Sequence, residues 1–310
     1  MTVPPPMSPL VGRRAYWHWA ATLSVLLTAA VVAVWHRQAV DTGTDHLAVA
    51  DRGWLSLAAA AAFSTWVCAA VTQQGAVVLR LPAARLLAAQ FAASAANHVL
   101  PGGLGATTVN WRFLTRCGLT PAATATALVL KATASAVTRG ALVTGLALAC
   151  PGILRLPRVP AAVLLVLVPP CALLVRPVRA RARSLLRTVS AEVRTVQAHR
   201  GRAAALWGGS LAFAAAHALT VYAVAHALAL SVPVARVALA YLAASSAAVL
   251  LPTPGGLGSL DAALALALVA IGVPGGAAAS TVIGYRLLTA WIPLVPGLAV
   301  LFVLARRKAL

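Results

Sequence analysis

The stretches NHVLPGGLGATT (residues 97–108) and LLPTPGGLGSLD (residues 250–261) carry the same pentapeptide, Pro-Gly-Gly-Leu-Gly, inside apolar parts of the chain. Glycine is flexible and proline interrupts helices, so this pentapeptide would break a membrane-crossing helix. The segments before it, 86–100 and 237–251, are also short, because fifteen helical residues reach only about 22 Å of a bilayer core about 30 Å thick. Both pentapeptides are therefore predicted to be the tips of re-entrant helical hairpins.

The composition is that of a membrane protein. Of the 310 residues, 61% are hydrophobic and 10% are charged, whereas a soluble domain carries roughly 25% charged residues. Apolar runs near the length of a membrane helix recur, and they lack the alternation of membrane β-strands. The sequence predicts an all-α polytopic membrane protein. Six full transmembrane helices are expected, at about 16–35, 54–79, 122–150, 159–175, 203–230 and 278–305.

The charges predict the topology. Twenty-five Lys and Arg stand against five Asp and Glu, and the segment 176–202 alone holds eight arginines and one glutamate. Arginine-rich loops beside apolar spans are typical of the cytoplasmic side, which explains the basic balance without nucleic acid. The loop 176–202 and both termini are cytoplasmic only if 86–100 turns back at its pentapeptide, and if 237–251 and 259–272 turn back from the other side. We expect a multi-pass protein of the cell membrane.

Similar residues follow the two pentapeptides in the same order. Gly118 and Pro121 follow the first, Gly272 and Pro274 follow the second, and a long apolar helix with an early cation comes next in both cases. Because the two hairpins enter from opposite sides, this pattern predicts an inverted-topology repeat, as in many transporters. The alternative is chance similarity in a sequence rich in Ala, Gly and Leu. The predicted organisation is a tail at 1–15, one transmembrane domain at 16–305 with repeats at about 86–150 and 237–305, and a basic tail at 306–310.

The hairpin tips and nearby cations form the candidate binding site. A glycine turn that starts a half-helix offers free N–H groups to an anion. Lys131, Arg139 and Arg286 lie within apolar helices and are expected to face the protein interior. Asp261 is the only acid in an apolar segment, and it either pairs with one of these cations, takes up a proton or caps a half-helix. The predicted substrate-binding residues are Pro101, Gly102, Gly103, Gly105, Asn110, Arg112, Lys131, Arg139, Pro254, Gly255, Gly256, Gly258, Asp261 and Arg286.

Simpler roles remain open for these residues. The glycines could serve close helix packing, and Lys131 could extend toward the membrane surface from one end of its helix. The chain has no HExxH, GxSxG or phosphate-binding GxxxxGK motif and no paired carboxylates. His217 and His226 share one span but face opposite ways. We therefore expect no metal, no cofactor and no enzymatic activity.

Two longer stretches carry a family resemblance. LPGGLGATTVNWRFLTRCGLTP (100–121) and LLPTPGGLGSLDAALALALVAIGVP (250–274), the latter followed by AAASTVIGYRLLTAWIPLVPGL (277–298), resemble the lysylphosphatidylglycerol synthase transmembrane family of flippase-like proteins. The resemblance implies an integral membrane protein associated with lipid translocation. In two-part synthases of this family, a cytosolic domain transfers lysine from its tRNA to phosphatidylglycerol. The present chain ends at ARRKAL, so the resemblance implies a membrane domain that stands alone.

The chain departs from the family pattern at both tips. Asp261 stands where the family usually carries glutamate, and Thr107, Thr108 and Asn110 stand where it usually carries an acid.

Together, the candidate site and the resemblance predict a flippase or transporter of an anionic lipid or lipid-linked substrate, with membrane lipids as partners. The alternatives are a secondary transporter of a small anion or amino acid, and an accessory subunit of a membrane lipid-glycan pathway. A homo-oligomer is compatible with the sequence.

Overall fold

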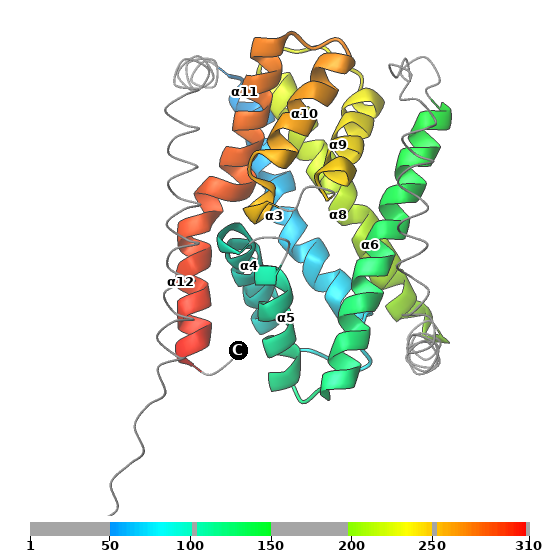
Figure 1. Ribbon diagram of the computed structural model, residues 1–310, viewed down its shortest axis with the longest axis vertical. Helices are drawn as coiled ribbons and strands as arrows, with labels where there is room; N and C mark the ends of the chain where they lie inside the picture. Colours follow the sequence, from blue (N-terminus) through cyan, green and yellow to red (C-terminus); the bar gives the residue numbers. More distant parts are fainter. Residues whose placement is uncertain (1–49, 101–103, 150–197, 250–252, 308–310) are drawn as a thin grey trace, which may run out of the picture.

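The computed structural model describes residues 50–100, 104–149, 198–249 and 253–307. Within these ranges every regular element is a helix and no strand occurs, which confirms the predicted all-α class (Figure 1). Several predicted features lie outside the described residues: the tail 1–15, the spans at 16–35 and 159–175, the basic loop up to 197, and the turn residues Pro101, Gly102 and Gly103.

Four of the described helices are long and apolar enough to cross a membrane. They are α3 (Arg52–Gly75), α6 (Pro121–Ala149), α8 (Arg200–Ala227) and a continuous helix, Gly275–Arg306, that contains α11 and α12. Their bounds differ from the predicted spans by four residues or fewer. The described part of the protein therefore contains four of the six predicted spans as candidates.

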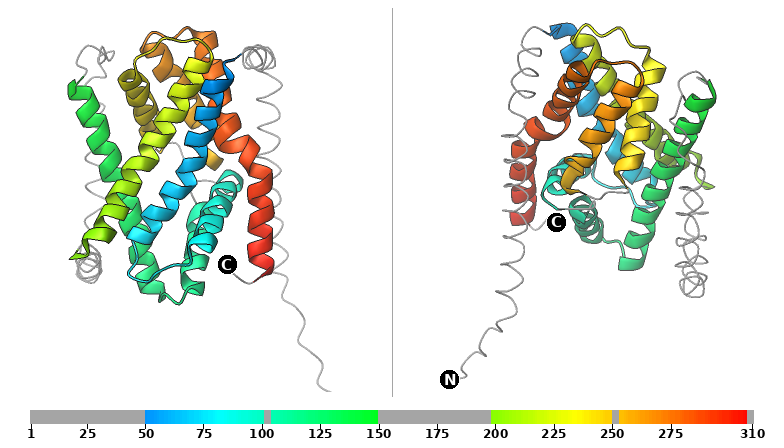
Figure 2. Two further views of the ribbon diagram at one scale, coloured as in Figure 1. Left: turned by 180° about the vertical axis from the view of Figure 1, so that it is seen from behind. Right: turned by 45° about the horizontal axis from the view of Figure 1, so that its top comes forward.

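The helices α3 and α8 pack side by side along their lengths (Figure 2). A Cβ atom at Gly75 would lie 2.3 Å from the backbone nitrogen of Leu206, and one at Gly209 would lie 2.6 Å from the Thr72 hydroxyl oxygen. Glycine is needed at both positions because the helices approach closely, as small residues allow in membrane proteins. The pair forms a scaffold beside which the shorter helices lie.

The shorter helices form two hairpins. α4 (Ala83–Val99) packs on α5 (Leu104–Arg116), and α9 (Val234–Ala248) packs on α10 (Ser259–Ala270). The mixed segment after the first pentapeptide is thus helical, and Gly105 lets α5 approach the carbonyl group of Ala96, where a Cβ atom would lie at 2.1 Å. These helices contain 12 to 17 residues and are about 18 to 26 Å long, shorter than a bilayer core.

The two hairpins point toward each other. Figure 1 shows α4 and α5 in one half of the molecule and α9 and α10 in the other half, with one end of each pair near the middle. The second turn contains the short helix η2 (Pro254–Gly256), which contacts α4. At Gly255 the backbone has a φ of 58°, and a Cβ atom would lie 2.4 Å from Cδ2 of His98. Only glycine fits this position, because it needs a left-handed backbone and direct contact with the first hairpin.

The last long helix changes geometry in its middle. α11 (Gly275–Arg286) passes into a π-helical turn, η3 (Leu287–Trp291), and then into α12 (Ile292–Arg306). Pro293 lies near the start of α12 and Pro296 lies inside it, so backbone hydrogen bonds are missing in this region. Further along, Gly297 packs closely on α4, with Ala95 2.7 Å from where its Cβ would be. The π-helical turn begins directly after Arg286 and so adjoins the candidate site.

Candidate functional site

A cavity of about 550 Å³ lies where the two hairpins meet. Residues of both hairpins line it, together with residues of α3, α6, α8 and α11. Among the described residues its lining contains three cations and no Asp or Glu. Its polar lining residues are Thr65, Thr72, Gln90, Ser94, Asn97, His98, Asn110, Lys131, Ser135, Arg139, His217, Tyr241, Ser245, Thr253, Tyr285, Arg286 and Thr289.

The structure brings six predicted site residues to this cavity. They are Asn110, Lys131, Arg139, Gly255, Gly256 and Arg286. Arg112 is exposed and lies outside the lining, while Gly105 is buried against α4 instead of facing the cavity. Pro254 starts η2, Gly258 is the N-cap residue of α10, and Asp261 lies in the first turn of α10.

Arg286 uses its guanidinium group to hold the second turn. Its Nη1 and Nη2 donate to the carbonyl oxygens of Gly255 at 3.0 Å and Gly256 at 2.6 Å, and its Nε donates to Oδ1 of Asp261. The Arg286 side chain is only 5% exposed, whereas that of Asp261 is 30% exposed. A buried cation is stable only when paired. Among the described residues, Asp261 and Arg286 form the only ion pair.

Asp261 also closes the N-terminus of α10. Its Oδ2 accepts a hydrogen bond from the backbone N–H of Gly258, the N-cap residue, at 2.9 Å, which is the half of a capping box that the third helical residue supplies. The neighbouring Ser259 hydroxyl lies 2.8 Å from the hydroxyl of Thr253. Two of the proposed roles of Asp261, pairing and capping, therefore coexist. The Gly258 N–H group expected to face an anion is already occupied from within the turn.

Lys131 belongs to a chain of amide groups on the first hairpin. Its Nζ donates to Oε1 of Gln90 at 3.0 Å, and Nε2 of Gln90 donates to Oδ1 of Asn110 at 2.7 Å. Nδ2 of Asn110 in turn donates to the carbonyl oxygen of Ala106 at 2.8 Å. Gln90 and Asn110 are both buried. The network fixes the position of the ammonium group but brings it no negative charge.

Arg139 contacts the second hairpin. Its Nη1 donates to the carbonyl oxygen of Ser245 at 3.3 Å. Ser245 lies in the last turn of α9, where backbone carbonyl groups carry partial negative charge. No described carboxylate pairs with this guanidinium group. Lys131 and Arg139 therefore bring positive charge to the cavity without a described acidic partner.

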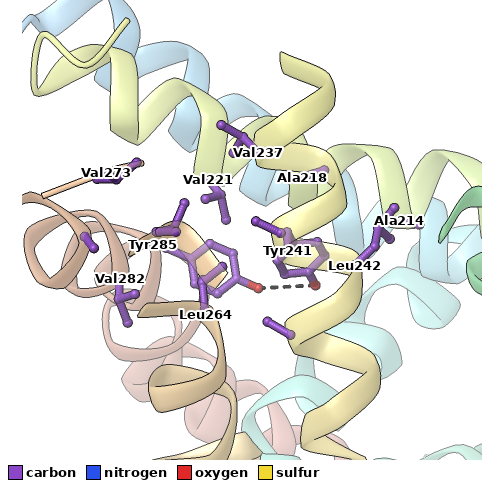
Figure 3. Packing of buried hydrophobic residues seen from close by; sticks show 14 residues of the cluster. Ala214, Ala218, Val221, Val237, Tyr241, Leu242, Leu264, Val273, Val282 and Tyr285 are labelled. Atoms are coloured by element: carbon purple, nitrogen blue, oxygen red, sulfur yellow. Dashed lines mark hydrogen bonds between the residues drawn. The ribbon is translucent and has the colours of Figure 1, made fainter. Parts of the chain in front are cut away.

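A group of aromatic residues on the same wall was not among the predicted site residues. Tyr241 from α9 and Tyr285 from α11 lie with their hydroxyl groups toward each other (Figure 3), 3.5 Å apart. The Tyr285 hydroxyl also lies 3.0 Å from Nδ1 of His217, whose ring stacks on Tyr241. Tyr285 precedes Arg286 in the sequence, which could have indicated its place. His217 gave no such signal, because its partners come from two other helices.

A comparison with known protein families agrees with these features. A model of the lysylphosphatidylglycerol synthase transmembrane region matches residues 19–297. The chain belongs to this family. The match spans both pentapeptides and the three cavity cations, and it confirms the resemblance carried by those stretches. No curated protein matches the chain. Membership in the lysylphosphatidylglycerol synthase transmembrane family, together with four apolar helices of sufficient length, identifies a membrane protein.

Proposed function

We propose that this protein is a flippase that carries an anionic lipid, or a lipid-linked anionic substrate, across the cell membrane. The observation that supports it most is the cavity between the two hairpins, where Lys131 and Arg139 have no described carboxylate partner. Burying cations in a membrane protein without counter-charge is unfavourable. An anionic headgroup in the cavity would supply that charge.

The fold suits this function if the hairpins are re-entrant. Each hairpin helix is too short to cross the bilayer, and the hairpins lie in opposite halves of the molecule (Figure 1). The end of α4 meets the second turn where His98 lies against Gly255. We interpret the hairpins as the halves of an inverted-topology repeat within a protein of six spans. Irregular backbone at membrane depth is stable where it is buried in protein or lines a polar cavity. The cavity lining at Gly255 and Gly256 is compatible with this interpretation.

The distribution of arginine supports a cytoplasmic location for one end of the molecule. One end of the molecule contains the connections from α3 to α4 and from α5 to α6, the start of α8 and the end of α12 (Figure 1). This end holds most of the described arginines. These are Arg80, Arg85, Arg112, Arg116, Arg200, Arg202, Arg306 and Arg307. The opposite end holds Arg52 and Arg236. The positive-inside rule therefore places the first end, including the end of α12, in the cytoplasm.

In this proposal the two halves have different tasks. Lys131 and Arg139 contact the anionic headgroup, while Arg286 and Asp261 hold the shape of the second turn. Access then alternates as one repeat moves against the other. The π-helical turn η3, beside Arg286, provides a point at which the last long helix can bend.

A liposome assay tests the proposal. The purified protein is reconstituted with fluorescent phosphatidylglycerol or phosphatidylcholine, and a membrane-impermeant reductant reports how fast each lipid changes leaflet. We expect phosphatidylglycerol to move faster, and the double variant K131Q/R139Q to lower that rate by at least about tenfold, a loss of about 1.4 kcal/mol. R116Q, which removes an exposed arginine outside the cavity, should behave as wild type.

The same assay separates the main alternative. A secondary transporter of a small anion would use the same cations but would move no lipid. If wild type and K131Q/R139Q move every lipid equally slowly, the flippase proposal is rejected. Uptake of a small organic anion that requires Lys131 and Arg139 would then support the alternative.

A further inference from the structure

The two cavity cations without a described acidic partner divide α6 into three nearly equal parts. Lys131 lies ten residues after Pro121, where α6 begins, and Arg139 lies ten residues before Ala149, where it ends. Arg139 follows Lys131 by eight positions, which correspond to about 12 Å along the helix axis, and each cation is about 15 Å from its nearer helix end. Both side chains nevertheless line one continuous cavity.

Each cation is bound to a different hairpin. Lys131 donates to Gln90 on α4, in the first hairpin, whereas Arg139 donates to the Ser245 carbonyl on α9, in the second. The two cations are thus held by different halves of the molecule, and their backbone positions are about 12 Å apart along α6. A phosphate that passes along α6 would meet Lys131 and Arg139 one after the other.

The charge of the third cation, Arg286, is already balanced by Asp261, and three of its five N–H groups are used within the protein. Nε, Nη1 and Nη2 of Arg286 already donate to Asp261, Gly255 and Gly256. Lys131 and Arg139 each donate to one neutral oxygen among the described residues, although an ammonium group has three donors and a guanidinium group five. Lys131 and Arg139 are thus the cavity cations that have donors to spare and no described carboxylate partner.

We propose that Lys131 and Arg139 are two successive binding sites for the phosphate of one anionic headgroup. Along α6, the Lys131 site is the one nearer the arginine-rich end of the molecule, and the Arg139 site is the one farther from it. This inference rests on the proposed lipid transport and adds a path to it. The ligand chemistry is a phosphodiester with a single negative charge, which either cation can balance alone. α6 is the element that both sites share, so it would guide the headgroup past the meeting point of the hairpins.

Binding and transport respond differently to single substitutions if the sites are successive. Removal of one cation leaves the other site available, so binding of short-chain phosphatidylglycerol to the detergent-solubilised protein should weaken by only about two- to threefold. Transport should nevertheless fall at least about tenfold in both K131Q and R139Q, because each interrupts the path. The double variant K131Q/R139Q should lose binding as well. K131R and R139K keep the charge and should recover transport if the loss arises from charge rather than misfolding.

The measurements are calorimetric binding of short-chain phosphatidylglycerol and the leaflet-exchange rate in liposomes, with R116Q as the control. One shared site would make both single variants lose binding and transport in parallel, and that result would overturn the two-site inference. The two-site inference would also be overturned if either K131Q or R139Q transported the lipid at the wild-type rate. These outcomes differ from a failure of the proposed function, in which wild type itself moves no lipid.

Discussion

Asp261 and Arg286 form an ion pair at the turn of the second hairpin, and the same guanidinium group donates to the carbonyl oxygens of Gly255 and Gly256. The acid comes from the first turn of α10 and the base from the end of α11. One contact thus joins the hairpin turn, its return helix and the next long helix. The cation lies just before the π-helical turn, so the pair links the geometry of the turn to the bend of the last helix.

Asp261→Asn should destabilise the protein. The substitution leaves Arg286 buried without a counter-charge, and removing one partner of a buried pair costs on the order of 3 kcal/mol; the partial exposure of Asp261 reduces this cost. Thermal unfolding in detergent should show a lower midpoint. Removing both charges, in D261N/R286Q, should recover part of the loss. A double variant less stable than both single variants would contradict the role given to the pair.

Gly255→Ala should separate the two hairpin turns. An alanine there must adopt a left-handed backbone, which costs about 1–2 kcal/mol, and its Cβ would collide with His98. Gly272→Ala is a matched control, because Gly272 has a φ of 99° and nothing lies near its Cβ position. Lipid transport in liposomes should fall for Gly255→Ala and stay near the wild-type rate for Gly272→Ala. Equal losses would show that backbone strain, not contact between the hairpins, is responsible.

Gln90→Glu should stabilise the protein and impair its transport. The new carboxylate would lie beside the Lys131 ammonium group, which now donates to the Gln90 amide. A paired lysine no longer attracts an anionic headgroup, so transport of phosphatidylglycerol should fall roughly tenfold, about 1.4 kcal/mol, while the unfolding temperature rises. Gln90→Leu removes the acceptor without adding charge, and it should lower stability instead. Unchanged transport in Gln90→Glu would exclude Lys131 from headgroup binding.

Thiols placed near the two turns test the re-entrant interpretation. Leu104 begins α5 and Leu257 follows η2, and neither residue lines the cavity. In a variant without native cysteines, Leu104→Cys and Leu257→Cys should react slowly with membrane-impermeant maleimides added from either side, because both turns are predicted to lie near mid-bilayer. Rapid labelling of both thiols from bulk water would refute the predicted hairpins.

Cys117 reports the orientation. It lies between α5 and α6, at the arginine-rich end, and burial raises the pKa of its thiol while the charge of Arg85 partly offsets this rise. A raised pKa leaves less thiolate at neutral pH, so labelling should speed up as the pH increases. Arg85→Gln should raise the pKa further and slow the reaction. The reagent should reach Cys117 only from the cytoplasmic side, and labelling only from outside would reverse the proposed orientation.

Much of the helix pattern follows from local properties of the chain. Apolar runs and breaks at Gly118, Pro121 and Gly272 predicted four described long helices to within a few residues. The pentapeptides marked the junctions between the paired short helices, and the half-helix expected after the first one is α5, Leu104–Arg116. The presence of Lys131, Arg139 and Arg286 in the protein interior also followed, since charged side chains avoid lipid.

The partners of those cations could not be read from the sequence. Arg286 and Asp261 are 25 positions apart, Lys131 and Gln90 are 41 apart, and Arg139 and Ser245 are 106 apart. No local periodicity relates such positions. Arg286 was predicted to bind a headgroup, but in the structure it pairs with Asp261 and donates to the Gly255 and Gly256 carbonyl groups of the second turn.

The sequence by itself determined the membrane class, the extent of the apolar helices and the two glycine turns, because hydrophobicity and backbone freedom are properties of neighbouring residues. Only the tertiary structure decided that His98 meets Gly255 and that Arg286 pairs with Asp261. It also decided that Lys131 and Arg139, which have no acidic partner among the described residues, face one cavity. Charge balance inside a membrane protein depends on which helices pack together, and that packing joins residues that are distant in the chain.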